Sequence, residues 1–261
     1  GVRRNAALFI QSQMSQKFDI SLRSFYGREC QAQNIHLQIG SQLNEHIQHF
    51  LMGFRRADGR HDAFADPEVE IVLNLTRPYQ HFEVSKAALL AGKPVYSEKP
   101  LGATWEEGLE LVRLAEEKGL WIGGAPDTYM GAGIQTCRKL IDEGAIGTVV
   151  GCAGFMICHG HETWHPDPEF YYKYGGGPMF DMGPYYLTCL VNLVGNVEAV
   201  SAMTKISFPE RLITSQPHNG EIVDVDVPTL YAGNMRFESG AIGTLYTTFD
   251  VHYPGQARLE V

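Results

Sequence analysis

The sequence predicts an α/β protein of two domains, and three observations support this prediction. Its 261 residues are enough for one large domain or two ordinary ones. Between residues 66 and 157, short aliphatic runs alternate with helical patterns, which is typical of a parallel sheet with helices packed on its faces. After residue 150 longer strand-like runs follow one another, which favours a mostly antiparallel sheet. We place the domain boundary near Ala125.

The first two strands and the helix between them have distinct local signals. Residues 71–75 form a β-branched and aliphatic run that predicts a buried strand. Apolar residues recur at helical spacing over residues 80–91, and Gly92 stands where a helix often ends on a glycine. Residues 94–97 predict the second strand.

A capping box marks the next helix. The sequence Thr104-Trp105-Glu106-Glu107 places a hydroxyl and a carboxylate three residues apart, which predicts a helix that continues to Lys118. Residues 120–122 predict a third strand. The apolar pattern over residues 134–141 predicts a further helix.

The second domain is predicted from one helix and three strand-like runs. The helix is expected from about Asp181 to Val194, and the runs cover residues 197–208, 225–237 and 241–252. Ser239-Gly240 is expected to join the last two runs in a hairpin. Residues 1–60 show no comparable pattern, apart from a strand-like run over residues 18–22.

Composition excludes several classes of partner. Hydrophobic residues make up 44% of the chain and charged residues 20%, which is typical of a soluble globular protein. The net charge of −9 provides no basic surface for a phosphate backbone, so we expect no nucleic-acid partner. The longest apolar run, residues 187–194, is too short to cross a bilayer, and no signal peptide is visible. We therefore expect no membrane partner and a cytoplasmic location.

The five cysteines favour reduced thiols. They are odd in number, scattered, and contain no C-x-x-C pair, which argues against a disulfide framework and a structural zinc site. Reduced thiols are typical of a reducing compartment.

A first candidate for chemistry is the segment Ser97-Glu98-Lys99-Pro100. It follows a predicted parallel strand, and the carboxyl ends of such strands are where open α/β sheets bind ligands. Lys99 is then placed to contact a substrate oxygen. The alternative from spacing alone is a surface Glu-Lys pair in a loop, and both interpretations stay open at this point.

A second candidate is the glycine-rich segment from Gly175 to Tyr186. Glycines allow backbone to approach a ligand closely. Asp181 is either the N-cap of the following helix or a functional carboxylate. Tyr185 lies one helical turn further on, and its phenol is either a proton donor and acceptor or a core aromatic.

Taken together, these segments resemble the Gfo/Idh/MocA family of oxidoreductases, the group of glucose-fructose oxidoreductase and inositol dehydrogenase. The resemblance runs from about residue 62 to about residue 250. It is carried by residues 66–76 with His81 at the next helix, by residues 88–101 with the sequence Glu-Lys-Pro, by residues 140–147, and by residues 175–185.

The resemblance implies a Rossmann-like nicotinamide-binding domain over residues 1–125, followed by an α+β domain with a large, mostly antiparallel open sheet over residues 126–261. It implies hydride transfer between NAD or NADP and a hydroxyl or carbonyl of a sugar or cyclitol. Lys99 would polarise the reacting oxygen, Asp181 would orient the substrate or the acid/base, and Tyr185 stands where the family usually has histidine.

The resemblance also implies the remaining site residues. The expected cofactor contacts are Leu75, Thr76, Pro78, His81, Glu98, Lys99 and Pro100. The expected substrate contacts are Asp127, His161, Trp164, His165 and Tyr172. A homo-oligomer formed through the second-domain sheet is expected as well.

The run His159-Gly160-His161-Glu162-Thr163-Trp164-His165 has two interpretations besides ordinary surface histidines. The spacing of its histidines is compatible with zinc or copper ligands. The family's chemistry needs no metal, and the run falls where its substrate loop is expected. We therefore favour polar and stacking contacts with a sugar and expect no metal.

The chain departs from the family pattern near both ends. No G-x-G-x-x-G occurs before residue 60, although the family holds the cofactor pyrophosphate there. Residues 5–9 and 18–20 resemble remnants of the first helix and second strand, and residues 258–261 resemble the opening of a strand. The chain thus resembles a family member shortened at both ends. The alternative function is a non-catalytic remnant with residual sugar-binding or oligomer-forming properties, and millimolar or weaker nicotinamide binding is expected.

Overall fold

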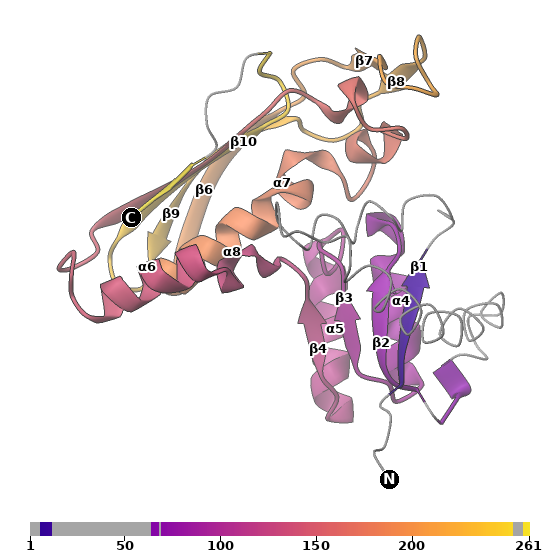
Figure 1. The fold of residues 1–261 in the computed structure, drawn as a ribbon, viewed down its shortest axis with the longest axis horizontal. Coiled ribbons are helices and arrows are strands. Elements are labelled where there is room, and N and C mark those ends of the chain that lie inside the picture. Colours follow the sequence, from indigo (N-terminus) through magenta and orange to yellow (C-terminus); the bar gives the residue numbers. More distant parts are fainter. Residues whose placement is uncertain (1–5, 12–63, 68, 253–257) are drawn as a thin grey trace, which may run out of the picture. The chain divides into compact units, whose positions relative to one another are not determined.

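The computed structural model describes the backbone of residues 6–11 and the residues 64–67, 69–252 and 258–261. They fall into two compact units. The first comprises residues 1–98 and 109–123, and the second comprises residues 99–108 and 124–261. Figure 1 labels their elements. None of the helices in the described ranges has both the length and the apolar character needed to span a bilayer.

The first unit is built on a four-stranded sheet. Its strands are β1 (Ala6–Gln11), β2 (Val69–Leu75), β3 (Val95–Ser97) and β4 (Ile122–Gly124), arranged in that order. β2 runs parallel to both β1 and β3. The short 3₁₀ helix η1 (Pro78–Gln80) and the helices α4 (His81–Leu90) and α5 (Trp105–Lys118) follow the strands. This alternation confirms the parallel sheet that the sequence predicts.

Strand β1 corrects one sequence-based expectation. Residues 5–9 were expected to belong to a helix, but residues 6–11 pair with β2 in parallel register from Ala7–Ile71 to Gln11–Leu75. The ladder supplies partners for the backbone groups of an apolar run too short for a stable isolated helix. Two further predictions, the strand at residues 18–20 and the lack of a glycine turn before residue 60, fall outside the described residues.

The core of the first unit forms between β2, β3 and the helices. Val72 and Val95 are buried on the strands, and Val84 and Ala88 are buried on α4. The capping box at α5 is present, because the Glu107 backbone N–H donates to Thr104 Oγ1 at 3.2 Å. Its carboxylate accepts from the backbone N–H of Ala103, one residue before the expected partner.

The second unit contains a five-stranded sheet in the order β11-β5-β10-β9-β6. These strands are β5 (Gly151–Ile157), β6 (Val197–Lys205), β9 (Leu230–Phe237), β10 (Ile242–Thr248) and β11 (Arg258–Glu260). All neighbouring pairs are antiparallel except β5 and β10, which are parallel. The expected hairpin joins β9 and β10, and Gly240 turns at φ +86. A separate two-stranded ribbon contains β7 (Glu210–Leu212) and β8 (Ile222–Asp224).

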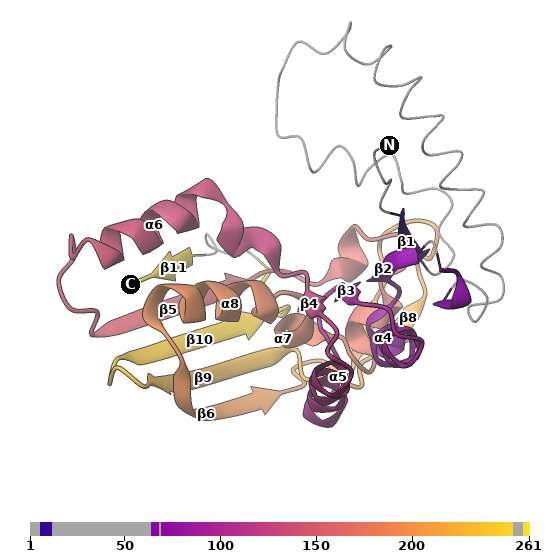
Figure 2. The ribbon, with the colours of Figure 1, turned by 90° about the horizontal axis from the view of Figure 1, so that it is seen from below.

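Helices of the second unit cover one face of this sheet (Figure 2). They are α6 (Ala132–Asp142), α7 (Gly177–Asp181) and α8 (Gly183–Val194). The connections contain three 3₁₀ helices, η2 (Asp127–Met130), η3 (His161–Thr163) and η4 (Glu169–Tyr172). Leu190 packs with Met235, Phe237 and Leu245 in one buried cluster.

The helix expected from about Asp181 to Val194 is present as α8, and the short helix α7 before it was not expected. α7 ends at Asp181, Met182 follows at φ −113 and ψ −28, and α8 starts at Gly183. Pro184 explains the break, because a proline in the first turn of a helix lacks the N–H that a continuous helix would need.

Candidate functional site

The centre of the candidate site is an ion pair between Lys99 and Asp181. Lys99 Nζ donates to Asp181 Oδ1 at 2.8 Å, and also to the main-chain oxygen of the same residue. The two side chains are only 15% and 14% exposed. The pair is therefore shielded from water, which distinguishes it from the surface Glu-Lys pair that the sequence left open.

The glycine run positions Asp181 at the end of α7. Gly177 has φ +81, and a Cβ atom there would lie 2.9 Å from the main-chain oxygen of Pro228. Only glycine combines this backbone geometry with this close approach. Asp181 is the last residue of α7, and the N-cap of α8 is Met182, which makes no side-chain capping bond. Asp181 is thus not a helix cap.

His161 is the second partner of Asp181. Its Nε2 atom lies 2.8 Å from Asp181 Oδ2. An ionised carboxylate only accepts hydrogen bonds, so we assign the proton of the imidazole to Nε2. Burial raises the pKa of Asp181, but the hydrogen bond from His161 and the charge of Lys99 outweigh burial and hold that pKa below its ordinary value of 3.8.

Tyr185 joins the cluster through its ring. It lies in the first turn of α8, and Lys99 Nζ is 5.3 Å from the ring centroid. This distance is within the range of a cation–π contact. The structure therefore brings together the three residues that the sequence selected for catalysis.

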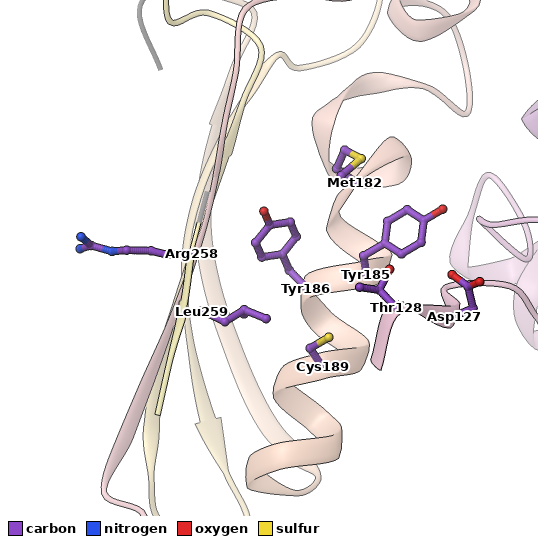
Figure 3. Close-up of a pocket in the computed structure, with 8 residues that line it drawn as sticks. All are labelled: Asp127, Thr128, Met182, Tyr185, Tyr186, Cys189, Arg258 and Leu259. Carbon is purple, nitrogen blue, oxygen red and sulfur yellow. The ribbon is translucent and has the colours of Figure 1, made fainter. Parts of the chain in front are cut away.

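A pocket of about 450 Å³ borders this cluster within the second unit. It is lined by Asp127, Thr128, Met182, Tyr185, Tyr186, Cys189, Arg258 and Leu259. In Figure 3 the two tyrosines leave α8 on different sides: Tyr186 lies toward the sheet near Leu259, and Tyr185 lies toward Asp127. The pocket thus unites two of the sequence-selected residues, Asp127 and Tyr185.

The expected substrate residues of the 159–172 segment differ in their access to a ligand. Trp164 is 61% exposed, and its ring centroid is 5.2 Å from that of His161. His165 is buried at 8% exposure, and its Nδ1 accepts the backbone N–H of Asp167 at 3.0 Å. Trp164 is therefore the member of this segment that is most open to a solute.

Tyr172 corrects the expectation of a substrate contact. Its side chain is 0% exposed and belongs to a core cluster with Met156, Ile213 and Phe249. Its hydroxyl accepts the backbone N–H of His161 at 3.1 Å and donates to Glu162 Oε2. Tyr172 therefore supports the histidine segment from inside the unit.

The turn after β2 belongs to the first unit and is held by Asn74. The Asn74 side-chain amide donates to the main-chain oxygen of His81 at 3.0 Å and to Ser85 Oγ at 2.9 Å. Its Oδ1 accepts the hydroxyl of Thr76 at 2.7 Å, and its main-chain oxygen accepts the backbone N–H of Glu98 at 2.8 Å. Sequence reasoning missed Asn74, although it stands in the middle of a predicted buried strand, where a polar residue is a usable signal.

Two of the expected cofactor residues are part of this internal network. His81 is 1% exposed, and its Nε2 lies 3.0 Å from the main-chain oxygen of Thr76. His81 therefore shapes the turn and does not present its side chain to a ligand, which corrects the expectation of a direct contact. Leu75, Pro78 and Glu98 remain partly exposed around the turn, whereas Pro100 is buried. Gln80 Oε1 is buried there without a hydrogen-bond partner among the described residues.

A buried charge network, which no sequence pattern predicted, lies behind the histidine segment. Arg211 Nη1 donates to Glu162 Oε1 at 3.0 Å, and Nη2 donates to Asp250 Oδ1. Thr229 Oγ1 donates to Asp250 Oδ2 at 2.8 Å. The two acids are 49 and 39 positions from Arg211 in the chain, so no local spacing could reveal them.

The histidines of the segment have separate environments. The ring of His159 stacks on that of His252 with centroids 4.9 Å apart, whereas His161 faces Asp181. Within residues 64–67, 69–252 and 258–261, no three His, Cys, Asp or Glu side chains gather in a way that could hold a metal ion.

Two family models match the chain. Residues 36–123 match the family model of an oxidoreductase family with an NAD-binding Rossmann fold, and residues 134–261 match that of the GFO/IDH/MocA C-terminal domain. The chain is 28% identical to levoglucosan dehydrogenase of Pseudarthrobacter phenanthrenivorans, covering 72% of this chain and 51% of that protein. It is 29% identical to scyllo-inositol 2-dehydrogenase (NADP(+)) of Bacillus subtilis, covering 66% of this chain and 45% of that protein.

A solved structure of levoglucosan dehydrogenase in complex with NADH and L-sorbose is also similar. It superimposes with a TM-score of 0.66 at 26% sequence identity, covering 75% of this chain and 53% of that one. The chain thus spans about half the length of the curated relatives it matches.

Proposed function

Because the chain belongs to the GFO/IDH/MocA family of oxidoreductases, we propose that it transfers a hydride between NAD or NADP and a hydroxyl of a sugar or cyclitol. The observation that supports this proposal is the shielded Lys99–Asp181 pair with Tyr185 beside it. Sugar and cyclitol dehydrogenases among the relatives support the substrate class.

The residues of the chain divide the proton chemistry among them. Lys99 donates a hydrogen bond to the reacting oxygen and stabilises the negative charge that grows on it as the C–H bond breaks. Asp181 holds the ammonium group in place through the 2.8 Å contact with Oδ1. Tyr185, as the phenolate, accepts the hydroxyl proton in oxidation, and as the phenol it returns the proton in reduction. A nicotinamide, when bound, supplies the acceptor or donor of the hydride.

The first unit fits a nicotinamide nucleotide in two respects. Its parallel strands end in a turn that is fixed from inside by Asn74, so the backbone at residues 75–78 presents a preorganised surface. Gln80 Oε1, which is buried and has no hydrogen-bond partner among the described residues, is an acceptor that a nucleotide hydroxyl or amide can satisfy. Leu75, Thr76, Pro78 and Glu98 are the proposed contacts, and residues 1–125 are the proposed cofactor domain.

Substrate recognition is proposed for residues 126–261. Asp127 lines the pocket with Tyr185 and offers a carboxylate to sugar hydroxyls. The exposed indole of Trp164 offers a flat apolar surface of the kind on which the C–H face of a sugar ring packs. We also propose a cytoplasmic homo-oligomer that associates through the sheet face opposite α8, where Met203 and Ile242 are 82% and 53% exposed.

Substitutions at the proton-handling residues test the function. Lys99→Met and Tyr185→Phe are each expected to lower the turnover number about 100-fold or more, because each removes a group that acts in the transition state. Tyr174→Phe is the matched control, because it removes an exposed phenol that bonds to Glu107 instead. Unchanged turnover in Tyr185→Phe would remove Tyr185 from the mechanism.

A non-catalytic sugar-binding or oligomer-forming protein is the second candidate. The observation that favours it is the lack of a G-x-G-x-x-G before residue 60. Calorimetric titration with NADH and NADPH separates the two candidates. Saturable binding, even at millimolar concentration, supports the enzyme, and binding of sugar without any nicotinamide binding supports the alternative.

A further inference from the structure

The charge network behind His161 is largely buried, and its three charged residues help to line a pocket of about 170 Å³. The side chains of Arg211, Glu162 and Asp250 are 5%, 6% and 8% exposed. Arg211 Nη1 also donates to the main-chain oxygen of Phe249 at 3.3 Å. Such a network contributes little net stability compared with apolar packing, so its presence calls for another explanation.

Glu162 connects this network to the 3₁₀ helix that carries His161. Its carboxylate accepts from Arg211 and from the Tyr172 hydroxyl. Its main-chain oxygen accepts the backbone N–H groups of Thr214 and Ser215 at 2.9 and 3.1 Å. Both the side chain and the backbone of Glu162 are therefore fixed.

Tyr172 completes the link to His161. Its hydroxyl is positioned by donating to Glu162 and, in turn, accepts the backbone N–H of His161 at 3.1 Å. The imidazole of His161 then reaches Asp181, whose other oxygen holds Lys99. Two sets of hydrogen bonds, joined through the covalent frame of His161, thus connect the buried network to the ammonium group.

Gly160 shows how tightly this series is packed. A Cβ atom at that position would overlap Glu162 Oε2 and the Tyr172 hydroxyl, and it would lie 2.7 Å from Arg211 Nη1. The backbone of Gly160 has φ −62, which any residue adopts, so the glycine is required by space alone.

We propose that Tyr172 and Glu162 are positioning residues, which fix His161 so that its imidazole orients Asp181 and, through Asp181, the ammonium group of Lys99. The proposal rests on the function proposed above for Lys99. It assigns no contact with substrate to Tyr172 or Glu162, because both are enclosed. Without the Tyr172 hydroxyl, the backbone N–H of His161 loses its acceptor and η3 can move relative to α7.

The first test observes His161 directly and does not depend on turnover. In the full chain, ¹⁵N NMR of the histidine side chains should show His161 as the Nε2–H tautomer. Tyr172→Phe and Glu162→Gln keep the shapes of the side chains, and both should shift the His161 signals and mix the tautomers. Tyr246→Phe, which removes a hydroxyl from β10, should leave them unchanged. Unchanged His161 signals in both variants would overturn the proposal.

The second test is kinetic and uses a double substitution. Tyr172→Phe should lower the turnover number about 10- to 100-fold, as small displacements of catalytic groups do, with the sugar KM within about twofold. In a His161→Ala background, Tyr172→Phe should lower the turnover number no further, because the imidazole through which Tyr172 acts on Asp181 is already absent. Multiplying effects would indicate a general structural role and overturn the proposal. An inactive parent chain would refute the proposed function alone, because the NMR result stands without turnover.

Discussion

Arg211 offers the sharpest test of how the second unit is held together. Arg211→Met keeps most of the side-chain length but removes the charge and the donors that Glu162 and Asp250 use. The two carboxylates are 6% and 8% exposed, so water replaces the lost partner only in part. Removing one member of a buried ion pair costs about 3–5 kcal/mol, because the remaining charges stay buried without compensation.

Urea denaturation of the full chain measures this cost. With a slope of about 2–3 kcal/mol per M, the midpoint should fall by about 1–2.5 M. Arg236→Met is the matched control, because Arg236 pairs with Glu198 on the surface, where the side chains are 55% and 53% exposed. Its midpoint should not change measurably. A shift for Arg211→Met below about 0.3 M, or equal to that of the control, would show that the buried ion pairs do not stabilise the second unit.

Three further predictions follow from packing and charge. Gly160→Ala should destabilise the fold by about 1–3 kcal/mol, because the added Cβ atom overlaps a buried carboxylate and a buried phenol. Gly133→Ala is the control, because a Cβ atom there meets nothing within 4 Å, and equal thermal midpoints of the two variants would contradict the prediction. In the folded chain the pKa of Asp181 lies below its ordinary value of 3.8. The ionised carboxylate therefore makes its full contribution to the free energy of unfolding above pH 3.8, and this contribution is lost as the pH falls through the pKa of the folded state. The stability difference between wild type and Asp181→Asn should therefore shrink as the pH falls from about 4 to 2, and a constant difference would count against the ion pair. Burial and nearby carboxylates raise the pKa of Cys158 to about 12. When the chain is alkylated at about pH 8 and peptides are followed over time by mass spectrometry, the exposed Cys137 should react before Cys158. Faster modification of Cys158 would contradict this prediction.

Local signals were sufficient for most elements of the fold. The aliphatic run at residues 71–75, the capping box at Thr104 and the hairpin at Gly240 each depend on neighbours within a few residues, and each appears in the structure. The short helix α7 was missed, because the glycines and proline at its start show no helical apolar pattern.

The candidate site divides in the same way. Lys99, Asp181 and Tyr185 were found through motifs, and the structure brings them into contact. The roles of Tyr172 and of the Arg211 network depend on residues up to 49 positions apart, and no periodic pattern records such contacts. Tyr172 was assigned to the substrate because aromatic composition does not distinguish a buried phenol from an exposed one.

Deuterium transfer would show whether this chain moves a hydride from a sugar carbinol to a nicotinamide. A sugar or cyclitol that carries deuterium on the reacting carbon would be incubated with the chain and millimolar NAD or NADP, and the reduced nicotinamide would be analysed by mass spectrometry. We expect the reduced nicotinamide to be one mass unit heavier than that formed from unlabelled substrate. The Lys99→Met variant should not form this labelled product. Unlabelled product, or equal label in wild type and Lys99→Met, would contradict the claim that this lysine serves hydride transfer from a sugar carbinol.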